Sequence, residues 1–424
     1  MTERIISILK KTDGISDYRI RSVRTESREL FFVHKELETV RSTDTVDTKV
    51  TVYVVHDGAL GEATFSIYSS YGDDRIAEEI EKARKKAAII SNQTYDLPAN
   101  ETRAFCSDSN FKDYNPAELA SLIADACFEA DDLEGGSINA LEVFVYKDTV
   151  TVKNSRGIDK TEVKYRAMAE AIPTWNGEES VELYEQYNFT EFDRAAIREE
   201  ISVKMREVRD RYVAKAPTEK LSCPVVLGAP ELEQLFGNFI GELNFAAVYQ
   251  HSNAFAVGDD IQKAKGGDPL ALTMCGNIRG SVQSAAFDGD GVTLSDRKII
   301  ENGKAVALWG GTRYAQYLGE TPTGNLGCIK VEAGTLTDKE LRSAPYFRCA
   351  SMSGLQVDVY NDYIGGEVRL AYYFDGEREI PVTGISISGK LSDALANMRL
   401  SENETVYEGY LGPRYALFTN IDIV

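Results

Sequence analysis

The sequence predicts an α+β protein, with an N-terminal α+β domain over residues 1–216 followed by a β-rich C-terminal domain over residues 217–424. Two observations predict this class. Helical and strand-like hydrophobic patterns alternate in the first half, whereas beyond residue 270 short strand-like runs are separated by glycine-rich turns. The segment Ala216-Pro217-Thr218 is the predicted linker, because a helical pattern ends there and a new strand-like run follows.

Helices are predicted where apolar residues recur every three or four positions. These patterns cover residues 2–11, 74–91, 116–127, 192–214 and 230–247. In the third of these helices, the residue before the pattern is an asparagine suited to be the N-cap, and a proline stands in its first turn. The Glu- and Arg-rich face of the helix over 192–214 is predicted to be a solvated face rather than a binding surface.

Strands are predicted from the alternation of apolar and polar residues. Valines alternate over residues 49–55, and Asp57-Gly58 then predicts a hairpin turn. Residues 141–152 are predicted to form two strands that turn at Lys147-Asp148, because alternating valines stand on both sides of that pair. The segment Asp288-Gly289-Asp290-Gly291 begins like a calcium-binding loop but lacks the later acidic ligands, so a hairpin turn is predicted there.

Composition limits the function classes. The 424 residues include 47 Lys and Arg against 67 Asp and Glu, giving a formal net charge of −20. Because nucleic-acid binding needs a basic surface, the charge predicts no nucleic-acid partner, and it disfavours anionic membranes. No apolar run is long enough for a membrane span, and the N-terminus lacks a signal-peptide core. The six scattered cysteines indicate reduced thiols, and a cytoplasmic location is predicted.

Candidate catalytic residues are few. A catalytic zinc site needs three protein ligands, often with two histidines on one helical stretch. The chain has only three histidines, His34, His56 and His251, and they are far apart in sequence. His34 and His56 lie in strand-like segments and are predicted to be polar surface or edge residues. His251 follows a predicted helix and is the one histidine predicted to touch a ligand.

A series of short motifs nevertheless carries a resemblance along nearly the whole chain. In order, they are Asn154-Ser155-Arg156-Gly157, Val225-Val226-Leu227, Phe287-Asp288-Gly289-Asp290-Gly291-Val292, Ile299-Ile300-Glu301-Asn302-Gly303-Lys304, Thr323-Gly324-Asn325 and Ile387-Ser388-Gly389. Together, in this order, they resemble the sequence motifs of the TldD/PmbA family, also called the modulator of DNA gyrase family.

The resemblance implies a specific metal chemistry. TldD-like members carry H-E-x-x-x-H on a helix and a later cysteine, with the glutamate acting as general base on a zinc-bound water. In the matching stretch here, Glu242 keeps the position of the acid, while Gly241 and Ala246 stand where the histidines would be. No cysteine follows Cys349. The resemblance therefore implies the PmbA/TldE-like branch, with no metal and no cofactor in this chain and Glu242 as a remnant of the motif.

The resemblance also implies a function. It predicts a non-catalytic subunit, inactive alone, that pairs with a zinc-bearing TldD-like paralogue to process or degrade unfolded peptides. His251 and Asn253, which follow the matched helix, are the candidate substrate-binding residues, and strand addition could hold the peptide. Two alternatives remain open: a binding or regulatory protein of the gyrase-modulator type without a peptidase partner, and a self-sufficient hydrolase with an unrecognised site. Whether the chain forms a homodimer is also open, as are the peptide substrates.

Overall fold

The structure is a computed structural model that describes residues 1–263 and 266–424, and its mixture of helices and strands confirms the α+β class. The helices are α1 (Thr2–Leu9), α2 (Asp73–Ala87), α3 (Pro116–Phe128), α4 (Arg194–Val213), α5 (Ala229–Glu242), α6 (Phe245–Tyr249), α7 (Thr312–Tyr317), α8 (Asp338–Leu341) and α9 (Leu391–Ala396), with a short 3-10 helix η1 over Asn110–Asp113. Across the described ranges, no helix is both long enough and apolar enough to cross a membrane.

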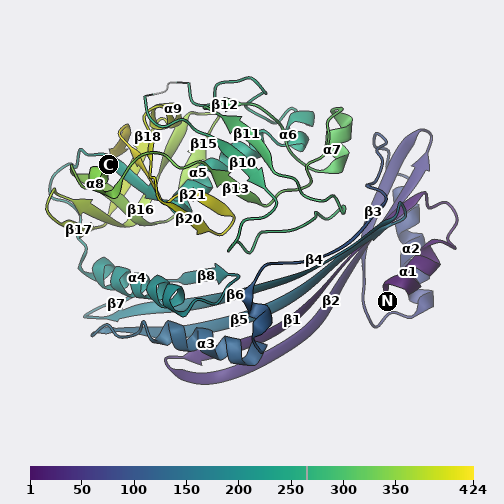
Figure 1. The fold of residues 1–424 in the computed structure, drawn as a ribbon, viewed down its shortest axis with the longest axis horizontal. Coiled ribbons are helices and arrows are strands. Elements are labelled where there is room, and N and C mark those ends of the chain that lie inside the picture. The colour runs from purple at the N-terminus through teal and green to yellow at the C-terminus, as the bar shows by residue number, and fades with distance from the viewer. Residues whose placement is uncertain (264–265) are drawn as a thin grey trace.

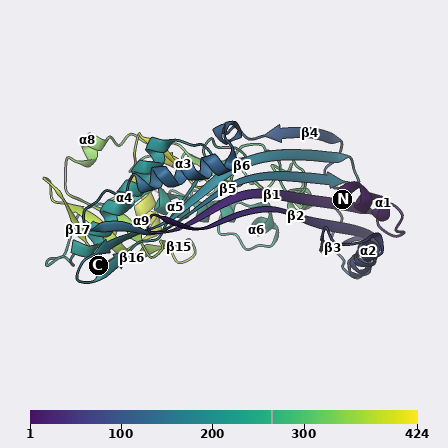
Figure 2. The same cartoon turned by 90° about the horizontal axis from the view of Figure 1, so that it is seen from below.

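The N-terminal part is built on one long curved sheet, here named sheet 1 (Figure 1). Its strands are β1 (Asp17–Val33), β2 (Glu36–His56), β3 (Ala59–Ile67), β4 (Glu101–Cys106), β5 (Gly136–Asn154), β6 (Ile158–Asn176), β7 (Ser180–Glu182) and β8 (Glu185–Phe189). The strand order is β3-β2-β1-β5-β6-β4, and β7 and β8 also pair with β6. Figure 2 shows β1, β2, β5 and β6 running side by side along the molecule.

Two pairs of helices cover the same face of sheet 1. Ile20 of β1 packs against α1 and α2 at one end of the sheet, and Leu30 packs against α3 and α4 at the other end. Side chains an even number of residues apart on a strand point to the same face, so both helix pairs lie on one side. The C-terminal part of the chain packs against the opposite face, where Val152 and Ile158 contact Phe287.

The predicted turn at Lys147-Asp148 is wrong, because β5 runs unbroken through this pair. Asp148 lies in mid-strand and is buried, and its carboxylate accepts hydrogen bonds from Thr25 Oγ1 (2.6 Å) and Arg166 Nε (2.8 Å). The chain turns instead after Asn154, where Gly157 adopts a left-handed φ of +91°. The hairpin at Asp57-Gly58 is confirmed, with β2 and β3 pairing on either side of it.

The helix predicted over residues 230–247 is also wrong in part, because it is two helices. α5 ends at Glu242, and α6 begins at Phe245 after a break. Asn244 causes the new start, since its side chain accepts a hydrogen bond from the backbone N–H of Ala246 (2.9 Å) and so caps α6. Because of the break, Glu242 at the end of α5 faces the loop that follows α6.

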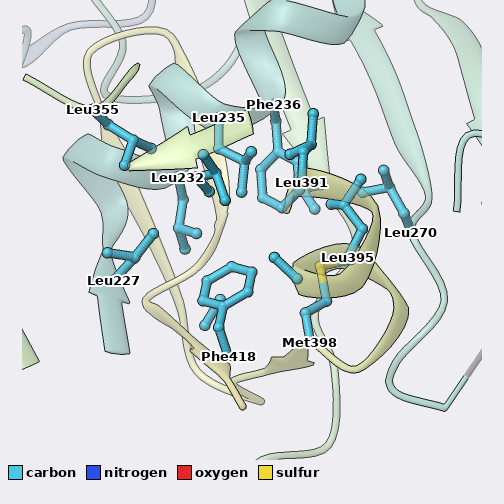
Figure 3. Packing of buried hydrophobic residues seen from close by; sticks show 14 of the residues in the cluster. Leu227, Leu232, Leu235, Phe236, Leu270, Leu355, Leu391, Leu395, Met398 and Phe418 are labelled. Atoms are coloured by element: carbon cyan, nitrogen blue, oxygen red, sulfur yellow. The ribbon is translucent and has the colours of Figure 1, made fainter. Parts of the chain in front are cut away.

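Two further sheets form the C-terminal part. Sheet 2 contains β9 (Val225–Gly228), β14 (Tyr346–Met352), β15 (Gln356–Asp358), β16 (Tyr363–Phe374), β17 (Glu379–Val382), β18 (Ile385–Gly389), β19 (Arg399–Leu400), β22 (Tyr415–Phe418) and β23 (Ile421–Ile423). Sheet 3 contains β10 (Leu272–Cys275), β11 (Arg297–Glu301), β12 (Lys304–Ala305), β13 (Cys328–Val331), β20 (Glu404–Tyr407) and β21 (Tyr410–Pro413). Figure 3 shows leucine and phenylalanine side chains of α5, α9, β9 and β22 packed together in the core of this part.

Polar contacts join the C-terminal part to sheet 1. Lys160 of β6 is fully buried, and its ammonium lies 2.5 Å from Glu101 Oε2 and 2.6 Å from Thr293 Oγ1. The Arg19 guanidinium forms an ion pair with Asp290, which stands in the predicted 288–291 turn. That turn is confirmed, since Phe287 and Thr293 form an antiparallel bridge around it. The C-terminal part is therefore held against the helix-free face and one edge of sheet 1.

Candidate functional site

Glu242 ends α5 and ties together three segments. Its carboxylate Oε2 accepts a hydrogen bond from the backbone N–H of Ala254, which lies beyond α6. The Tyr360 hydroxyl lies 3.2 Å from the same oxygen and 2.8 Å from the carbonyl oxygen of Ser252. Tyr360 belongs to the turn between β15 and β16. Glu242 thus holds the loop over residues 252–254 against the end of α5, which is a structural role.

The two predicted substrate-binding residues lie in this loop. His251 is exposed and has a left-handed φ of +55°, and its N–H donates to the carbonyl of Val248 (3.2 Å), so it terminates α6. Asn253 is partly buried, and its Nδ2 donates to the carbonyl of Phe255 (2.8 Å). Neither of these hydrogen bonds involves Glu242. The structure brings Glu242 to the backbone of this loop, and His251 presents its ring to solvent.

The residues matched to the zinc motif do not fit a zinc ion. Gly241 and Ala246 have no ligating side-chain atom, and Glu242 Oε2 already accepts the two hydrogen bonds described above. Within residues 1–263 and 266–424, no group of three His, Cys, Asp or Glu side chains is placed to hold a metal. The residues at the matched positions therefore do not form a zinc-binding set.

The other two histidines are held apart by the fold. His34 was expected in a strand but lies in the exposed turn between β1 and β2, with a left-handed φ of +52°. His56 ends β2, and its Nε2 lies 2.8 Å from the carbonyl oxygen of Ile90. A strand of the length of β2 separates the two histidines by roughly 60 Å, so they cannot share a site.

A cleft of about 520 Å³ lies between sheet 1 and the C-terminal part. Its walls come from β8 and α4 on one side and from the start of α5, β14 and β20 on the other. Asn188 Nδ2 of β8 donates to Glu408 Oε1 (2.7 Å), and Arg279 pairs with Glu191 (2.9 Å), so two contacts join the walls. Local sequence patterns could not bring the two walls of this cleft together, because the walls are about 20 to 220 residues apart in the chain.

The cleft holds several carboxylates around one lysine. Glu200, Lys204 and Glu207 recur at helical spacing on α4, and Lys204 Nζ lies 3.0 Å from Glu207 and 3.5 Å from Glu185 of β8. Glu231 enters from the first turn of α5. The prediction that this face of α4 is solvated is therefore wrong for Glu207, which is only 7% exposed. The spacing of these three α4 residues was the available signal, but it could not reveal the opposite wall.

Burial changes the acid strength of these groups. Desolvation raises the pKa of Glu185 to about 7, although the Lys204 ammonium opposes the shift. Desolvation also raises the pKa of Glu231 to about 7, against backbone hydrogen bonds that favour its ionised form. The pKa of Glu200 is raised for the same reason. The cleft therefore contains carboxyl groups that gain or lose a proton near neutral pH.

Comparison with known proteins agrees with this architecture. Residues 220–424 match the family model described as the PmbA/TldA metallopeptidase C-terminal domain. The chain is 26% identical over 198 residues to Metalloprotease PmbA of Escherichia coli O157:H7 and 25% identical over 198 residues to a Metalloprotease PmbA homolog of Haemophilus influenzae. Each match covers 44% of this chain and 43% of the relative, so it spans less than half of the relatives' length.

Solved structures share the fold over the full length. The structure of TldE from Thermococcus kodakarensis matches with a TM-score of 0.81 at 16% identity, covering 100% of this chain and 99% of that chain. A protein of Thermotoga maritima described as a candidate modulator of a DNA gyrase matches with a TM-score of 0.79 at 16% identity and the same coverage. At these identities the likeness concerns the fold alone.

The architecture defines the protein as an α+β protein with a metallopeptidase-like C-terminal domain. The domain match, the PmbA relatives and the shared fold support the TldD/PmbA family, and the family model itself covers residues 220–424.

Proposed function

We propose that the chain is the metal-free, TldE/PmbA-like subunit of a TldD–TldE type zinc metallopeptidase complex that processes or degrades unfolded peptides. The observation that carries the proposal is the use of Glu242. Its carboxylate binds the Ala254 N–H and the Tyr360 hydroxyl, and Gly241 and Ala246 stand at the positions matched to the zinc-binding histidines. A residue that would serve as general base in a zinc site here fastens a loop.

The proposal gives the chain a supporting role in the complex. The zinc and the general base would belong to a TldD-like paralogue, and this chain would supply part of the wall that holds the peptide. His251 and Asn253 remain the proposed substrate contacts near Glu242, because the exposed His251 ring borders the loop that Glu242 fastens. We further propose that the domains meet near residue 217 and that the complex works in the cytoplasm.

Purification from the native host tests the partnership. The tagged chain should co-purify with a paralogue that contains an intact H-E-x-x-x-H, identified by mass spectrometry, and zinc should follow the paralogue when the two are separated. Recovery of gyrase subunits without such a paralogue would favour the binding or regulatory alternative. Recovery of the tagged chain alone, bearing tightly held zinc and cleaving peptides, would favour the self-sufficient hydrolase.

A further inference from the structure

The cleft between sheet 1 and the C-terminal part runs between two strands at sheet edges. β8 pairs with β6, and β20 ends the strand order of sheet 3 and pairs with β21. Residues of both strands line the cleft. A neighbouring cavity of about 470 Å³ shares Pro230, Glu231 and Tyr407 with the cleft, so the groove continues past the start of α5. A groove that continues through two cavities can take an extended chain.

The β20 edge can accept another strand. β20 and β21 are joined by a two-residue turn at Glu408-Gly409, and Tyr407 pairs with Tyr410 across it. In such a hairpin the closing pair exchanges hydrogen bonds, so the N–H and C=O of Tyr407 point to β21 and those of Val406 point outward. Val406 is 40% exposed at this edge. Backbone groups arranged in this way bind peptides by strand addition, largely independent of peptide sequence.

The charge of the groove selects among extended peptides. In the described part of the chain, its lining carries seven Asp or Glu and four Lys or Arg side chains. Lys204 lies beside Glu207, Arg279 pairs with Glu191, and Arg348 pairs with Glu379 outside the lining at 3.2 Å. Three of the four cations in the groove thus have a carboxylate partner, and the carboxyl groups of Glu200 and Glu231 lie in the same lining, where a bound cation would favour their ionised forms. A basic side chain complements this lining.

We propose that this groove binds an extended, lysine-containing peptide segment, which adds to the β20 edge and places its ammonium group beside Glu200 and Glu231. This inference rests on the proposed function and deepens it, because it adds a second contact for the unfolded peptide, at the start of α5, and names which peptides that contact favours. It can be tested without the paralogue, so its outcome is separate from that of the partnership.

The test measures binding of two fluorescent, unstructured peptides to the full chain alone by anisotropy. The peptides are identical except that glutamine replaces every lysine in the second. We expect the lysine peptide to bind at least about tenfold more tightly, since charge pairs in a partly desolvated groove contribute on the order of a kcal/mol or more. Glu200→Gln combined with Glu231→Gln should reduce this preference to within about twofold.

Control variants separate the groove from net charge. Glu36→Gln combined with Glu320→Gln removes the same charge at exposed positions away from the cleft and should keep the preference of about tenfold. Val406→Pro removes the outward N–H at an edge position that tolerates proline, and it should weaken binding of both peptides about fivefold or more. Circular dichroism confirms folding of each variant. Equal binding of the two peptides by the wild type, a preference kept by the double groove variant, or full binding by Val406→Pro would overturn the proposal.

Discussion

Glu242 stands at the position of the glutamate in the family's zinc motif, but its role in this chain is structural. Its contacts are with Ala254, twelve residues later, and with Tyr360, 118 residues later. The sequence predicted that Glu242 would be a remnant of the zinc motif, but neither contact follows from local pattern, because each depends on how α5, α6 and the β15–β16 turn pack together. His251 and Asn253 were predicted to bind substrate only because they follow the matched helix in the sequence.

Removing the Tyr360 hydroxyl should loosen the loop over residues 252–254. Tyr360→Phe deletes the one O–H donor that lies between the Ser252 carbonyl and the Glu242 carboxylate, and we expect the free energy of unfolding to fall by about 0.5–1.5 kcal/mol. Hydrogen exchange at the Ala254 amide should become faster. Tyr184→Phe is the matched control, because Tyr184 is as exposed (61%) as Tyr360 (64%). Unchanged exchange at Ala254 in Tyr360→Phe would show that Glu242 holds the loop without Tyr360.

The carboxyl groups of the cleft should make stability depend on pH. The folded-state pKa of Glu231 is raised to about 7 from an ordinary value of 4.5, so the folded protein binds this proton more tightly than the unfolded chain does. The stabilisation of the folded state by this proton is fully present below about pH 4.5 and is lost as the pH rises through 7. Glu231→Gln should therefore raise the thermal midpoint relative to the wild type more at pH 8 than at pH 5.

A carboxyl group with the opposite shift provides the control for this measurement. A backbone hydrogen bond at Thr337 lowers the pKa of Glu340, so Glu340→Gln should cost more stability at pH 8 than at pH 3. The pH dependence would be attributed to the wrong group if Glu231→Gln changed the midpoint equally at pH 5 and pH 8.

At the scale of elements, the sequence predicted the helices and strands that have clear capping residues or regular apolar spacing. α3 begins at Pro116 after the Asn115 cap, whose side chain accepts from the Ala117 N–H at 2.9 Å. The β5 turn was misplaced because Lys147-Asp148 is a typical turn pair locally. In the sheet, Asp148 accepts from Thr25 and Arg166 on the neighbouring strands, and Lys147 lies 3.7 Å from Glu26 of β1. The break between α5 and α6 was missed because apolar spacing continues through it, and the cap at Asn244 decides where the second helix begins.

The cap of α4 offers a test at this scale. The Asp193 side chain accepts from the backbone N–H groups of Ala195 and Ala196, both at 3.0 Å. Asp193→Ala should lower the free energy of unfolding by about 1 kcal/mol in urea denaturation, whereas Asp193→Asn should cost less because asparagine also caps. Equal losses in both variants would assign the effect to the charge of Asp193 rather than to its hydrogen bonds.

At the scale of the whole molecule, the sequence predicted the α+β class, while the cleft needed the three-dimensional structure. Arg313 of α7 lies 2.9 Å from Glu62 of β3, and Gln316 bonds to the backbone of Asp96, so contacts distant in sequence fix how the parts meet. These pairs are 251 and 220 residues apart, beyond the reach of any local pattern.

The net charge carries a prediction for the whole surface. With a formal charge of −20, the chain should not bind duplex DNA at physiological salt, because it cannot make the many Lys and Arg contacts to phosphate that supply non-specific affinity. A gel-shift titration at 150 mM salt checks this. Sub-micromolar binding that weakens steeply with added salt would contradict it and revive a direct role on DNA.

A reconstituted cleavage assay on an unfolded peptide tests the central claim most directly. It compares this chain alone, the zinc-bearing paralogue alone and the two together, each with and without a chelator. We expect this chain alone to be inactive and the mixture to cleave, with activity abolished when the motif glutamate of the paralogue is replaced and only modestly changed by Glu242→Ala or His251→Ala here. Cleavage by this chain alone, as fast as by the mixture and insensitive to chelator, would contradict the account.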